Sequence, residues 1–433
     1  MFLTLFQTFE CIFCTSAFAA LFDGVANGQT DEELATGLTL TFKFDFFQTP
    51  SIDFRQTPAA TFDFKANLQP AGFWGDYNCD SPYWFDESVN IDLVYYIGDS
   101  IDHGVWETTY ELINDVNAHI VDKFKENFGD VLVVPVIGNH EAQPTNQFAP
   151  SSVTGERLNT TWLYEGLANK WDQYLTEEAK ETLRERGEFS ILARPGLRVI
   201  SLNNNVAYKM NWWLVYDPLD AKTHLDWLIE ELYKAELAGE KVHILAHIPP
   251  GVSDFTHTWT REYNRIVNRF SSIIAAEFNG HTHSDEFKIF YSLDNNEPIN
   301  MAWGAGSTTS FTDFNLNYKE PTDIVNYVYN LTEANLTPHR RPHWFELYNV
   351  RNRFGINDLS ASSMDQIVHS MVTDNTQLLD LYVAFFYKLS DNRWPLMPHC
   401  DDNCKINILC RIVVTVLWER EKCEELRSLF YAT

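Results

Sequence analysis

Two short strings of metal-ligating residue types lie near the middle of this 433-residue chain: Gly138-Asn139-His140-Glu141 and Gly280-His281-Thr282-His283. Gly98-Asp99 precedes them, and a lone His247 lies between them. Imidazole, carboxylate and amide oxygen are together suited to Zn²⁺ or a similar divalent ion. Two such ions about 3.5–4 Å apart clamp the oxygens of a phosphodiester and activate water for its hydrolysis. The ordered set therefore predicts a metal-dependent phosphoester hydrolase.

Each of these polar strings follows an apolar run that is typical of a buried strand. Strand, polar loop and helix alternate along the chain, which indicates a layered α/β fold. In such folds the functional loops lie at the carboxyl ends of the strands, where every candidate ligand falls. We expect strands over Asp92–Ile97, Val131–Ile137, Arg198–Leu202, Lys241–Ala246 and Ile273–Phe278, and helices over Val105–Asn127, Leu219–Leu237 and Met364–Leu389.

Composition divides the chain into four parts. Residues 1–20 are apolar and end in an Ala-Phe-Ala cleavage pattern, which fits either a signal peptide or a ragged N-terminus. Residues 21–70 repeat Gln-Thr-Pro and Phe-Asp-Phe and are atypical of a folded domain. Residues 71–357 are expected to form the catalytic domain, and residues 358–433 a helical C-terminal subdomain.

The overall charge limits the classes of partner. Lys and Arg number 32 against 60 Asp and Glu, which gives a formal net charge of −28. Such a charge excludes nucleic acid as a partner and disfavours anionic membranes near neutral pH, while acidification softens the repulsion. A hydrophobic content of 45% supports a large core. We expect no transmembrane segment, because apart from the N-terminal run no stretch is long and apolar enough to span a bilayer.

Four of the seven cysteines lie in a short tail: Cys400, Cys404, Cys410 and Cys423. This spacing fits a zinc knuckle, although no histidine lies inside the cluster, or two local disulfides that brace C-terminal helices.

Three Asn-x-Ser/Thr sequons, at Asn159, Asn330 and Asn335, fit N-glycosylation on a secretory route. Sequons and disulfides together predict a secreted or lysosomal protein.

The surroundings of the motifs resemble the acid sphingomyelinase family of calcineurin-like metallophosphoesterases, from about Ala71 to Cys423. The resemblance implies a four-layer β-sandwich flanked by helices, followed by a helical subdomain with Cys400–Cys404 and Cys410–Cys423 disulfides. It also implies two zinc ions and cleavage of sphingomyelin, a phospholipid at a membrane or lipoprotein surface, to ceramide and phosphocholine. The stretches that carry it are Gly98–Trp106, Gly138–Pro144, Trp162–Glu165, Val242–Gly251 and Phe278–Phe287.

The resemblance also implies which residues hold the two ions. Asp99 would bridge them. Asn139, His247 and His281 would complete the shell of one ion, and His283 would belong to the other.

The remaining motif residues are implied to act on the substrate. His103 and His140 would hold the phosphate and protonate the departing ceramide oxygen. Glu141 would orient His140 by accepting a hydrogen bond from it.

The first member of the family's ligand series is an Asp-x-His on the first core strand, and this chain has no histidine before His103. The nearest substitute is Asp45, two residues before Phe47, which cannot bind a metal. The second ion therefore keeps only Asp99 and His283 as ligands, fewer than a stable zinc site needs. This difference makes a protein that holds one ion instead of two an open alternative.

Three functions follow from this pattern. The first is a sphingomyelin phosphodiesterase. The second is a non-catalytic secreted paralogue that binds a metal or a phospholipid. The third is a phosphodiesterase that acts on other phosphoesters.

Between Phe314 and Asn330 the chain is shorter than the family, and we expect a strand to be lost there.

Overall fold

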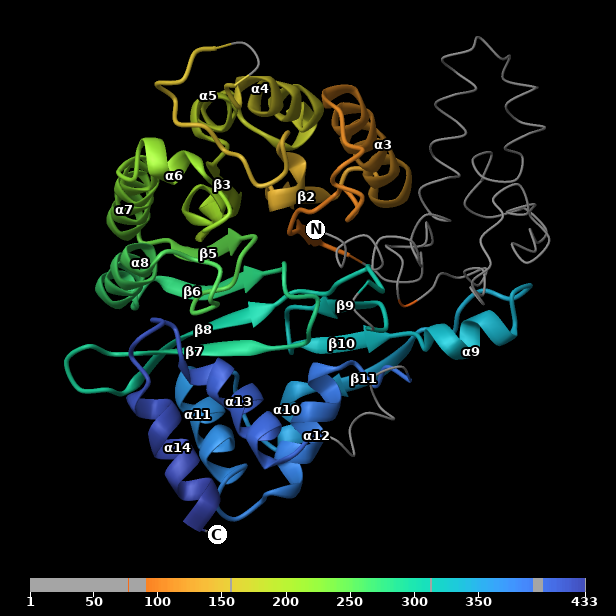
Figure 1. Cartoon of the computed structure of the whole chain (residues 1–433), viewed down its shortest axis with the longest axis vertical. Helices are drawn as coiled ribbons and strands as arrows, with labels where there is room; N and C mark the ends of the chain where they lie inside the picture. Colours follow the sequence, from red (N-terminus) through yellow and green to blue (C-terminus); the bar gives the residue numbers. More distant parts are fainter. Residues whose placement is uncertain (1–76, 78–90, 156–157, 312–313, 392–399, 433) are drawn as a thin grey trace, which may run out of the picture.

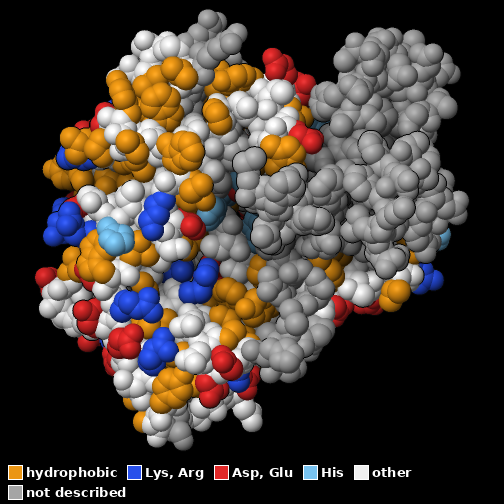
Figure 2. All heavy atoms as spheres, viewed as in Figure 1, with side chains coloured by type: hydrophobic (Ala, Val, Ile, Leu, Met, Phe, Trp, Pro, Cys, Tyr) orange, Lys and Arg blue, Asp and Glu red, His pale blue; other side chains and the backbone are white. Residues whose placement is uncertain are grey.

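The computed structural model describes residues 77, 91–155, 158–311, 314–391 and 400–432 (Figure 1). The predicted signal peptide, the atypical segment at 21–70 and its Asp45 lie outside the described residues. Acidic and basic side chains are interspersed over the face shown in Figure 2.

The largest sheet has six strands in the order β3-β4-β5-β6-β8-β7. Its four inner strands run parallel, and β3 and β7 are antiparallel edges. Because parallel strands end at the same edge of a sheet, the loops that follow β5 and β6 come together. The strands are β3 (Phe189–Arg194), β4 (Leu197–Leu202), β5 (Lys241–Ala246), β6 (Ile274–Asn279), β7 (Phe287–Tyr291) and β8 (Pro298–Gly304).

A two-stranded parallel sheet of β1 (Leu93–Tyr96) and β2 (Leu132–Pro135) packs on one face of the large sheet. Successive side chains of a strand point to opposite faces. Tyr95 of β1 therefore faces the large sheet, where its hydroxyl lies 2.8 Å from Nδ1 of His243. The next residue, Tyr96, packs the other way against α3 (Tyr110–Phe128), through a ring contact with Phe124.

Helix α7 (Asp220–Ala238) covers the opposite face of the large sheet, over β4 and β5. Its Glu231 accepts a hydrogen bond from the hydroxyl of Ser190 on β3 at 2.5 Å. Ser190 is paired with Ile200, and Ile200 with Ile244, so Ser190 points away from the face that carries His243. Helix α3, the small sheet, the large sheet and α7 thus form the four layers that were predicted.

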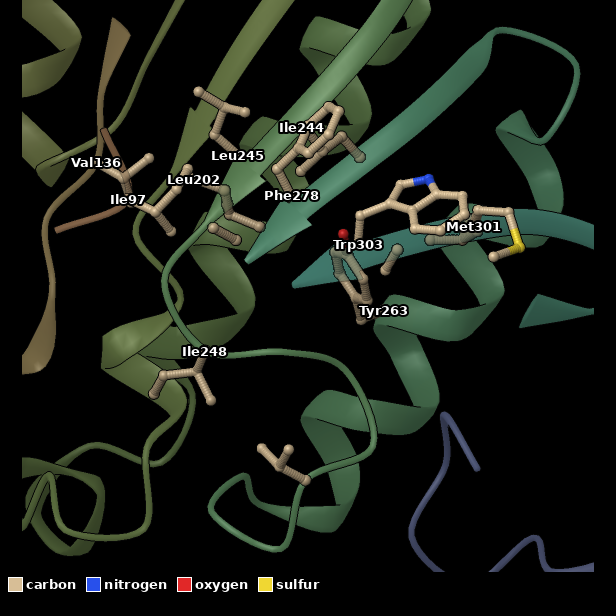
Figure 3. Close-up of a cluster of buried hydrophobic side chains, with 14 of the residues drawn as sticks. Ile97, Val136, Leu202, Ile244, Leu245, Ile248, Tyr263, Phe278, Met301 and Trp303 are labelled. Carbon is tan, nitrogen blue, oxygen red and sulfur yellow. The ribbon is translucent and has the colours of Figure 1, made fainter. Parts of the chain in front are cut away.

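Buried side chains at the carboxyl ends of the strands form a firm base beneath the functional loops (Figure 3). Ile97 and Val136, which follow β1 and β2, belong to the same core cluster as Leu202, Leu245 and Phe278 of the large sheet. Burying an aliphatic or aromatic side chain of this size stabilises the fold by roughly 1.5–3 kcal/mol.

The predicted strands and helices that flank the site are confirmed, with one shifted start. The helix expected from Val105 begins at Tyr110, because the Thr109 side chain accepts a hydrogen bond from the Leu112 backbone and caps it there. The segment between Phe314 and Asn330, in which we expected a strand to be lost, forms two strands. They join a three-stranded antiparallel sheet of β9 (Asn317–Glu320), β10 (Val325–Val328) and β11 (Phe345–Asn349).

The C-terminal part is helical, as predicted. Disulfides join Cys400 to Cys404 and Cys410 to Cys423, so these sulfurs are bonded to each other and the zinc-knuckle alternative is wrong. The single helix expected over Met364–Leu389 is instead two helices, α11 (Ala361–Ser370) and α12 (Gln377–Phe386), separated by a turn. Helices α13 (Asp402–Val413) and α14 (Glu421–Ala432) follow, and the short α10 (Val350–Phe354) precedes this part.

The other described helices are short or lie outside the site: α4 (Thr161–Lys170), α5 (Glu177–Arg186), α6 (Trp213–Tyr216), α8 (His257–Phe270) and α9 (Leu331–Leu336). Among the described residues, no helix has both the length and the apolar character needed to cross a bilayer.

Candidate metal centre

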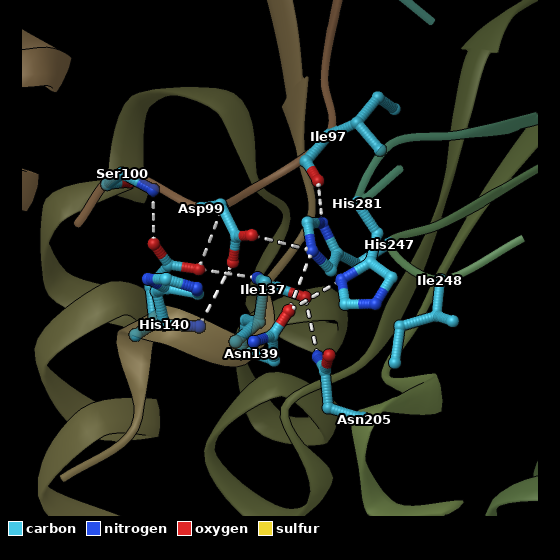
Figure 4. Close-up of polar contacts among 12 residues, drawn as sticks. Ile97, Asp99, Ser100, Ile137, Asn139, His140, Asn205, His247, Ile248 and His281 are labelled. Atoms are coloured by element: carbon cyan, nitrogen blue, oxygen red, sulfur yellow. Dashed lines mark hydrogen bonds and ion pairs between the residues drawn. The ribbon is translucent and has the colours of Figure 1, made fainter. Parts of the chain in front are cut away.

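The candidate ligands lie in four loops that follow parallel strands (Figure 4). Asp99 follows β1, and Asn139 begins the short 3₁₀ turn after β2. His247 comes directly after β5, and His281 two residues after β6. Strand pairing therefore brings together residues that lie up to 182 positions apart in the sequence.

Glycine is required where the loops after β1 and β2 meet. A Cβ atom on Gly138 would lie 2.2 Å from Oδ1 of Asp99, and one on Gly98 would lie 2.4 Å from the backbone nitrogen of Gly138. Both distances are shorter than any real Cβ contact. The two glycines thus allow the backbone of one loop to touch the ligand of the other.

Three of the motif residues adopt left-handed backbone conformations that side chains other than glycine rarely take. The φ angles are 57° at Asp99, 67° at His281 and 56° at His283. Each such residue costs roughly 1–3 kcal/mol and persists only where the surroundings hold it. Their concentration at the ends of two strands marks a functional site.

The metal-ligating atoms of Asp99, His247 and His281 all lie within 4.8 Å of one another. Nε2 of His247 is 2.9 Å from Oδ2 of Asp99 and 3.1 Å from Oδ1 of Asn139. Nδ1 of His281 is 2.9 Å from the same Asn139 oxygen. Two imidazole nitrogens, a carboxylate oxygen and an amide oxygen thus converge on one point.

The far ring nitrogen of each histidine faces an acceptor, which fixes the near one as a lone-pair donor to a metal. Nδ1 of His247 lies 2.6 Å from the carbonyl oxygen of Ile97, which can only accept. Nε2 of His281 lies 3.3 Å from the carboxylate of Asp254. In the neutral rings, Nε2 of His247 and Nδ1 of His281 are left without a proton and point inward. This second contact of each ring is the usual support of a metal-ligating histidine.

Asn139 presents its oxygen to the same point. Its amide nitrogen donates to Oδ1 of Asn146 at 2.8 Å, which orients the oxygen towards both histidines. Four acceptor atoms in close contact need a cation between them. The donor set of Asp99, Asn139, His247 and His281 therefore fits a divalent ion such as Zn²⁺.

The electrostatics of the buried pair agree with a cation site. Burial alone would raise the pKa of Asp99, but the charges of His247 and His140 outweigh it and hold that pKa well below its usual value. Burial would lower the pKa of His247, and the adjacent Asp99 raises it instead. Each group thus favours the charged form of the other, and a bound cation would take the place of the proton that otherwise lies on Nε2 of His247, facing Asp99.

Glu141 does not contact His140 in the way we expected. Its buried carboxylate accepts hydrogen bonds from three backbone amides, those of Gly138 (2.5 Å), Asp99 (3.0 Å) and Ser100. These amides belong to the loops after β2 and β1, so Glu141 holds the two ligand-bearing loops together. This contact corrects the predicted role of Glu141.

His140 is oriented by the backbone instead. Its Nδ1 lies 2.9 Å from the carbonyl oxygen of Asp102, and its own backbone N–H donates to Oδ1 of Asp99 at 3.0 Å. Its ring packs edge-on against His103, with centroids 4.6 Å apart. The two histidines predicted to contact the substrate are therefore brought together beside the candidate ligands.

His283 belongs to this histidine cluster and not to the group formed by Asp99, His247 and His281. Its ring centroid lies 5.4 Å from that of His103, which in turn stacks on Phe311 at 4.0 Å. Burial, reinforced by the charges of His103 and Lys388, lowers the pKa of His283 to about 3. His283 is therefore neutral near pH 5 and able to offer a lone pair.

Sequence reasoning missed Asp254, Asn146, Asp102 and Phe311, each of which supports a motif residue. Asp254 lies seven residues after His247 in the same loop, so an acidic residue after the β5 motif is the signal that could have found it. The other three lie within irregular loops, where spacing carries no periodicity.

The three sequon asparagines are partly buried. The side-chain amide nitrogen of Asn159 donates to Gly155, and that of Asn330 donates to Asp391. Asn335 lies inside α9.

The chain matches two family profiles, described as calcineurin-like phosphoesterase over residues 81–285 and acid sphingomyelin phosphodiesterase C-terminal region over residues 300–423. It is 36% identical to a sphingomyelin phosphodiesterase of Bos taurus in an alignment 368 residues long, which covers 80% of this chain and 57% of that protein. The human sphingomyelin phosphodiesterase gives 36% identity over 372 residues, with the same two coverages. The chain thus spans less than two thirds of the length of these two relatives.

The chain is also 30% identical to the cyclic GMP-AMP phosphodiesterase SMPDL3A of Mus musculus, over 80% of this chain and 82% of that protein. A solved structure of a dimetal phosphatase from Danio rerio is 13% identical, and the match covers 55% of this chain and 77% of the phosphatase chain. Its TM-score of 0.29 is too low to bear on the fold. The chain belongs to the acid sphingomyelinase family of calcineurin-like phosphoesterases.

Proposed function

We propose that this protein is a zinc-dependent phosphodiesterase that cleaves sphingomyelin to ceramide and phosphocholine. The observation that carries the proposal is the convergence of Asp99, Asn139, His247 and His281 beside the His103–His140 pair. The substrate class is supported by the sphingomyelin phosphodiesterases of cow and human, to which the chain is 36% identical.

The residues around the site divide the chemistry between them. Zn²⁺ bound to the four ligands would polarise the phosphoryl group and offset its developing negative charge. Nδ1 of His140 donates its proton to the Asp102 carbonyl, so Nε2 would deliver a proton to the departing ceramide oxygen from the doubly protonated ring, which then becomes neutral. His103 lies against His140 and restricts its ring, and His103 is itself held by stacking on Phe311.

Replacement of His140 by alanine tests this role. The H140A protein is expected to lose turnover by about 10²–10⁴-fold, the usual contribution of a general acid. Its zinc content should stay near that of the wild type, because the backbone N–H that binds Asp99 is kept. Release of phosphocholine from sphingomyelin and zinc analysis of the same sample measure the two quantities.

His119→Ala, on the exposed side of α3, is the matched control and should leave both quantities unchanged. Full activity of H140A would remove His140 from the mechanism.

Cleavage of other phosphodiesters is the second candidate. The chain covers 82% of the mouse cyclic GMP-AMP phosphodiesterase but 57% of the bovine and human sphingomyelin phosphodiesterases. The two substrates should therefore be compared on one preparation. Faster turnover of the nucleotide diester would favour this second function, and turnover of neither substrate by a zinc-loaded protein would favour a non-catalytic paralogue.

The number of zinc ions per chain is a separate test. Among the described residues, one ion has four candidate ligands, whereas a second ion has Asp99 and His283. We expect one tightly held zinc after dialysis, measured by atomic spectroscopy. Two tightly held ions would show that residues outside the described range supply further ligands.

We further propose a secreted or lysosomal location with N-glycans at Asn159, Asn330 and Asn335. The two disulfides of the C-terminal part support it, because disulfides persist in oxidising compartments. A shift in electrophoretic mobility after glycosidase treatment of the secreted protein would report the glycans.

A further inference from the structure

Two adjacent buried acids follow the His281–His283 turn. Asp285 and Glu286 are each 2% exposed and lead from the turn into β7. Burying a carboxylate is costly unless it is paired, so the partners of these acids show what the turn is fixed to.

Asp285 is bound by one residue from each strand of the small antiparallel sheet. It lies 2.5 Å from the ammonium of Lys319 on β9 and accepts hydrogen bonds from Asn326 on β10 (2.5 Å) and Tyr348 on β11 (2.6 Å). Its own backbone N–H donates to the carbonyl of Phe386, the last residue of α12. The small sheet and α12 thus fix the residue two positions after His283.

Glu286 is bound by the C-terminal helix α13. Arg411 donates from Nε to Oε2 at 3.0 Å and from its terminal nitrogen to Oε1 at 2.9 Å, a two-pronged geometry. Lys288 lies 3.4 Å from the same carboxylate and donates to the carbonyl oxygen of Arg411. Cys410, next to Arg411, is disulfide-bonded to Cys423, which joins α13 to α14.

We propose that Arg411 and Glu286 are a positioning pair, through which the C-terminal helical part holds the His281–His283 turn in the geometry that binds metal. The inference rests on the metal centre proposed above. The turn needs an external hold, because both histidines have left-handed backbone conformations that relax when their surroundings loosen. The C-terminal part is then a component of the metal site and not an independent appendage.

Arg411→Met in the full chain removes the charge and keeps much of the side-chain volume. We expect it to weaken zinc binding by about 10–100-fold, the usual cost of losing a group that supports a metal ligand. In the cobalt-substituted protein, the visible absorption bands should shift, since they report ligand geometry directly. R411K keeps the charge but cannot form the two parallel hydrogen bonds to Glu286, so it should restore part of the zinc affinity.

Arg198→Met is the matched control. Arg198 forms a comparable pair with Glu240, with Nε 2.7 Å from Oε2. It lies near the start of β4, whereas the metal loops follow the ends of the strands, so its loss should affect stability alone. Unfolding by denaturant and zinc affinity are measured for both variants.

Equal zinc affinity of R411M and R198M, with the wild-type cobalt spectrum, would overturn the proposal and leave Arg411 with a structural role only. If R411M does not fold, E286Q decides, because it removes the charge of the other partner: wild-type zinc affinity and the wild-type cobalt spectrum in E286Q would equally overturn the proposal. Zinc binding is read without substrate, so a wild type that binds zinc but cleaves no sphingomyelin would refute the proposed function and leave this test valid. A wild type that binds no zinc would overturn both.

Discussion

The contact with Asp254 orients His281 so that its ring can bind a metal. Its carboxylate lies 3.3 Å from Nε2 of His281, which leaves Nδ1 free to face the Asn139 oxygen. Asp254→Ala should lower zinc affinity by about 10–100-fold, because the ring loses both its orientation and part of its basicity. Equilibrium competition with a zinc chelator measures the change.

Asp122→Ala, on the exposed side of α3, serves as the control for this prediction. An unchanged affinity of the Asp254 variant would mean that the contact with Asn139 alone orients His281.

The sequence predicted the ligands more readily than their supports. Asn139, His247 and His281 lie directly after apolar runs, where strand ends make their positions predictable. Asp254 lies in an irregular loop, and only the fold brings it to His281. The role of Glu141 was mistaken because its neighbour in the sequence is His140, whereas its neighbours in space are backbone amides from two loops.

The loops after β1 and β2 are two elements that touch backbone to backbone. Gly138→Ala would place a Cβ atom 2.2 Å from the Asp99 carboxylate and 2.3 Å from its backbone nitrogen. The loops must then separate, so we expect loss of tight zinc binding and a destabilisation of roughly 1–3 kcal/mol, the usual cost of overpacking. Denaturant unfolding and zinc analysis test both outcomes.

Gly155→Ala is the control for the glycine prediction. Its added Cβ atom would meet its nearest neighbour, Leu158, at an ordinary distance of 3.5 Å. A Gly138 variant that resembled this control would show that the two loops are not held in contact.

The positions of the strands that precede the site loops could be predicted from runs of apolar residues. The strands of the small antiparallel sheet could not. Strands such as Leu132–Pro135 have uninterrupted apolar runs that identify them. The small antiparallel sheet was missed because its strands carry polar residues, including Lys319 and Asn326, that bind the buried Asp285. Alternation of polar and apolar residues fails as a signal wherever a buried polar network replaces an apolar face.

The contact between α13 and the turn before β7 predicts a dependence of stability on pH. Burial alone would raise the pKa of Glu286, but the charges of Lys288 and Arg411 lower it from its ordinary value of 4.5 to about 2. A depressed carboxyl pKa adds stability that is complete above about pH 4.5 and is lost as the pH falls towards 2. The wild type should therefore lose up to about 3 kcal/mol from this group over that interval.

Glu286→Gln removes the titrating group. Its free energy of unfolding should be lower than that of the wild type at pH 5, and the difference should shrink as the pH approaches 2. Glu178→Gln, on the exposed side of α5, should instead follow the wild type at every pH. A constant difference between wild type and Glu286→Gln would contradict the low pKa of Glu286.

At the scale of the whole molecule, the net charge governs which lipid surfaces the protein would approach. The formal net charge is −28, yet charges of both signs are interspersed on the face shown in Figure 2. The repulsion from an anionic membrane is therefore a property of the summed field, which acts over a distance set by the ionic strength. The candidate metal site also attracts cations. The electrostatic potential at the site and the potential around the whole molecule are therefore both negative.

Under the proposed function, turnover of sphingomyelin in vesicles should therefore depend on the other lipids present. At pH 7 and low salt, sphingomyelin in vesicles that contain phosphatidylserine should be cleaved more slowly than in zwitterionic ones, because the protein is repelled before the head group reaches His140. The gap should narrow at high salt, which screens the field, and at pH 5, where histidines and some carboxylates gain protons. A water-soluble phosphodiester in the same mixtures should show no such gap. If the anionic vesicles were cleaved faster at pH 7, a local basic surface would outweigh the net charge.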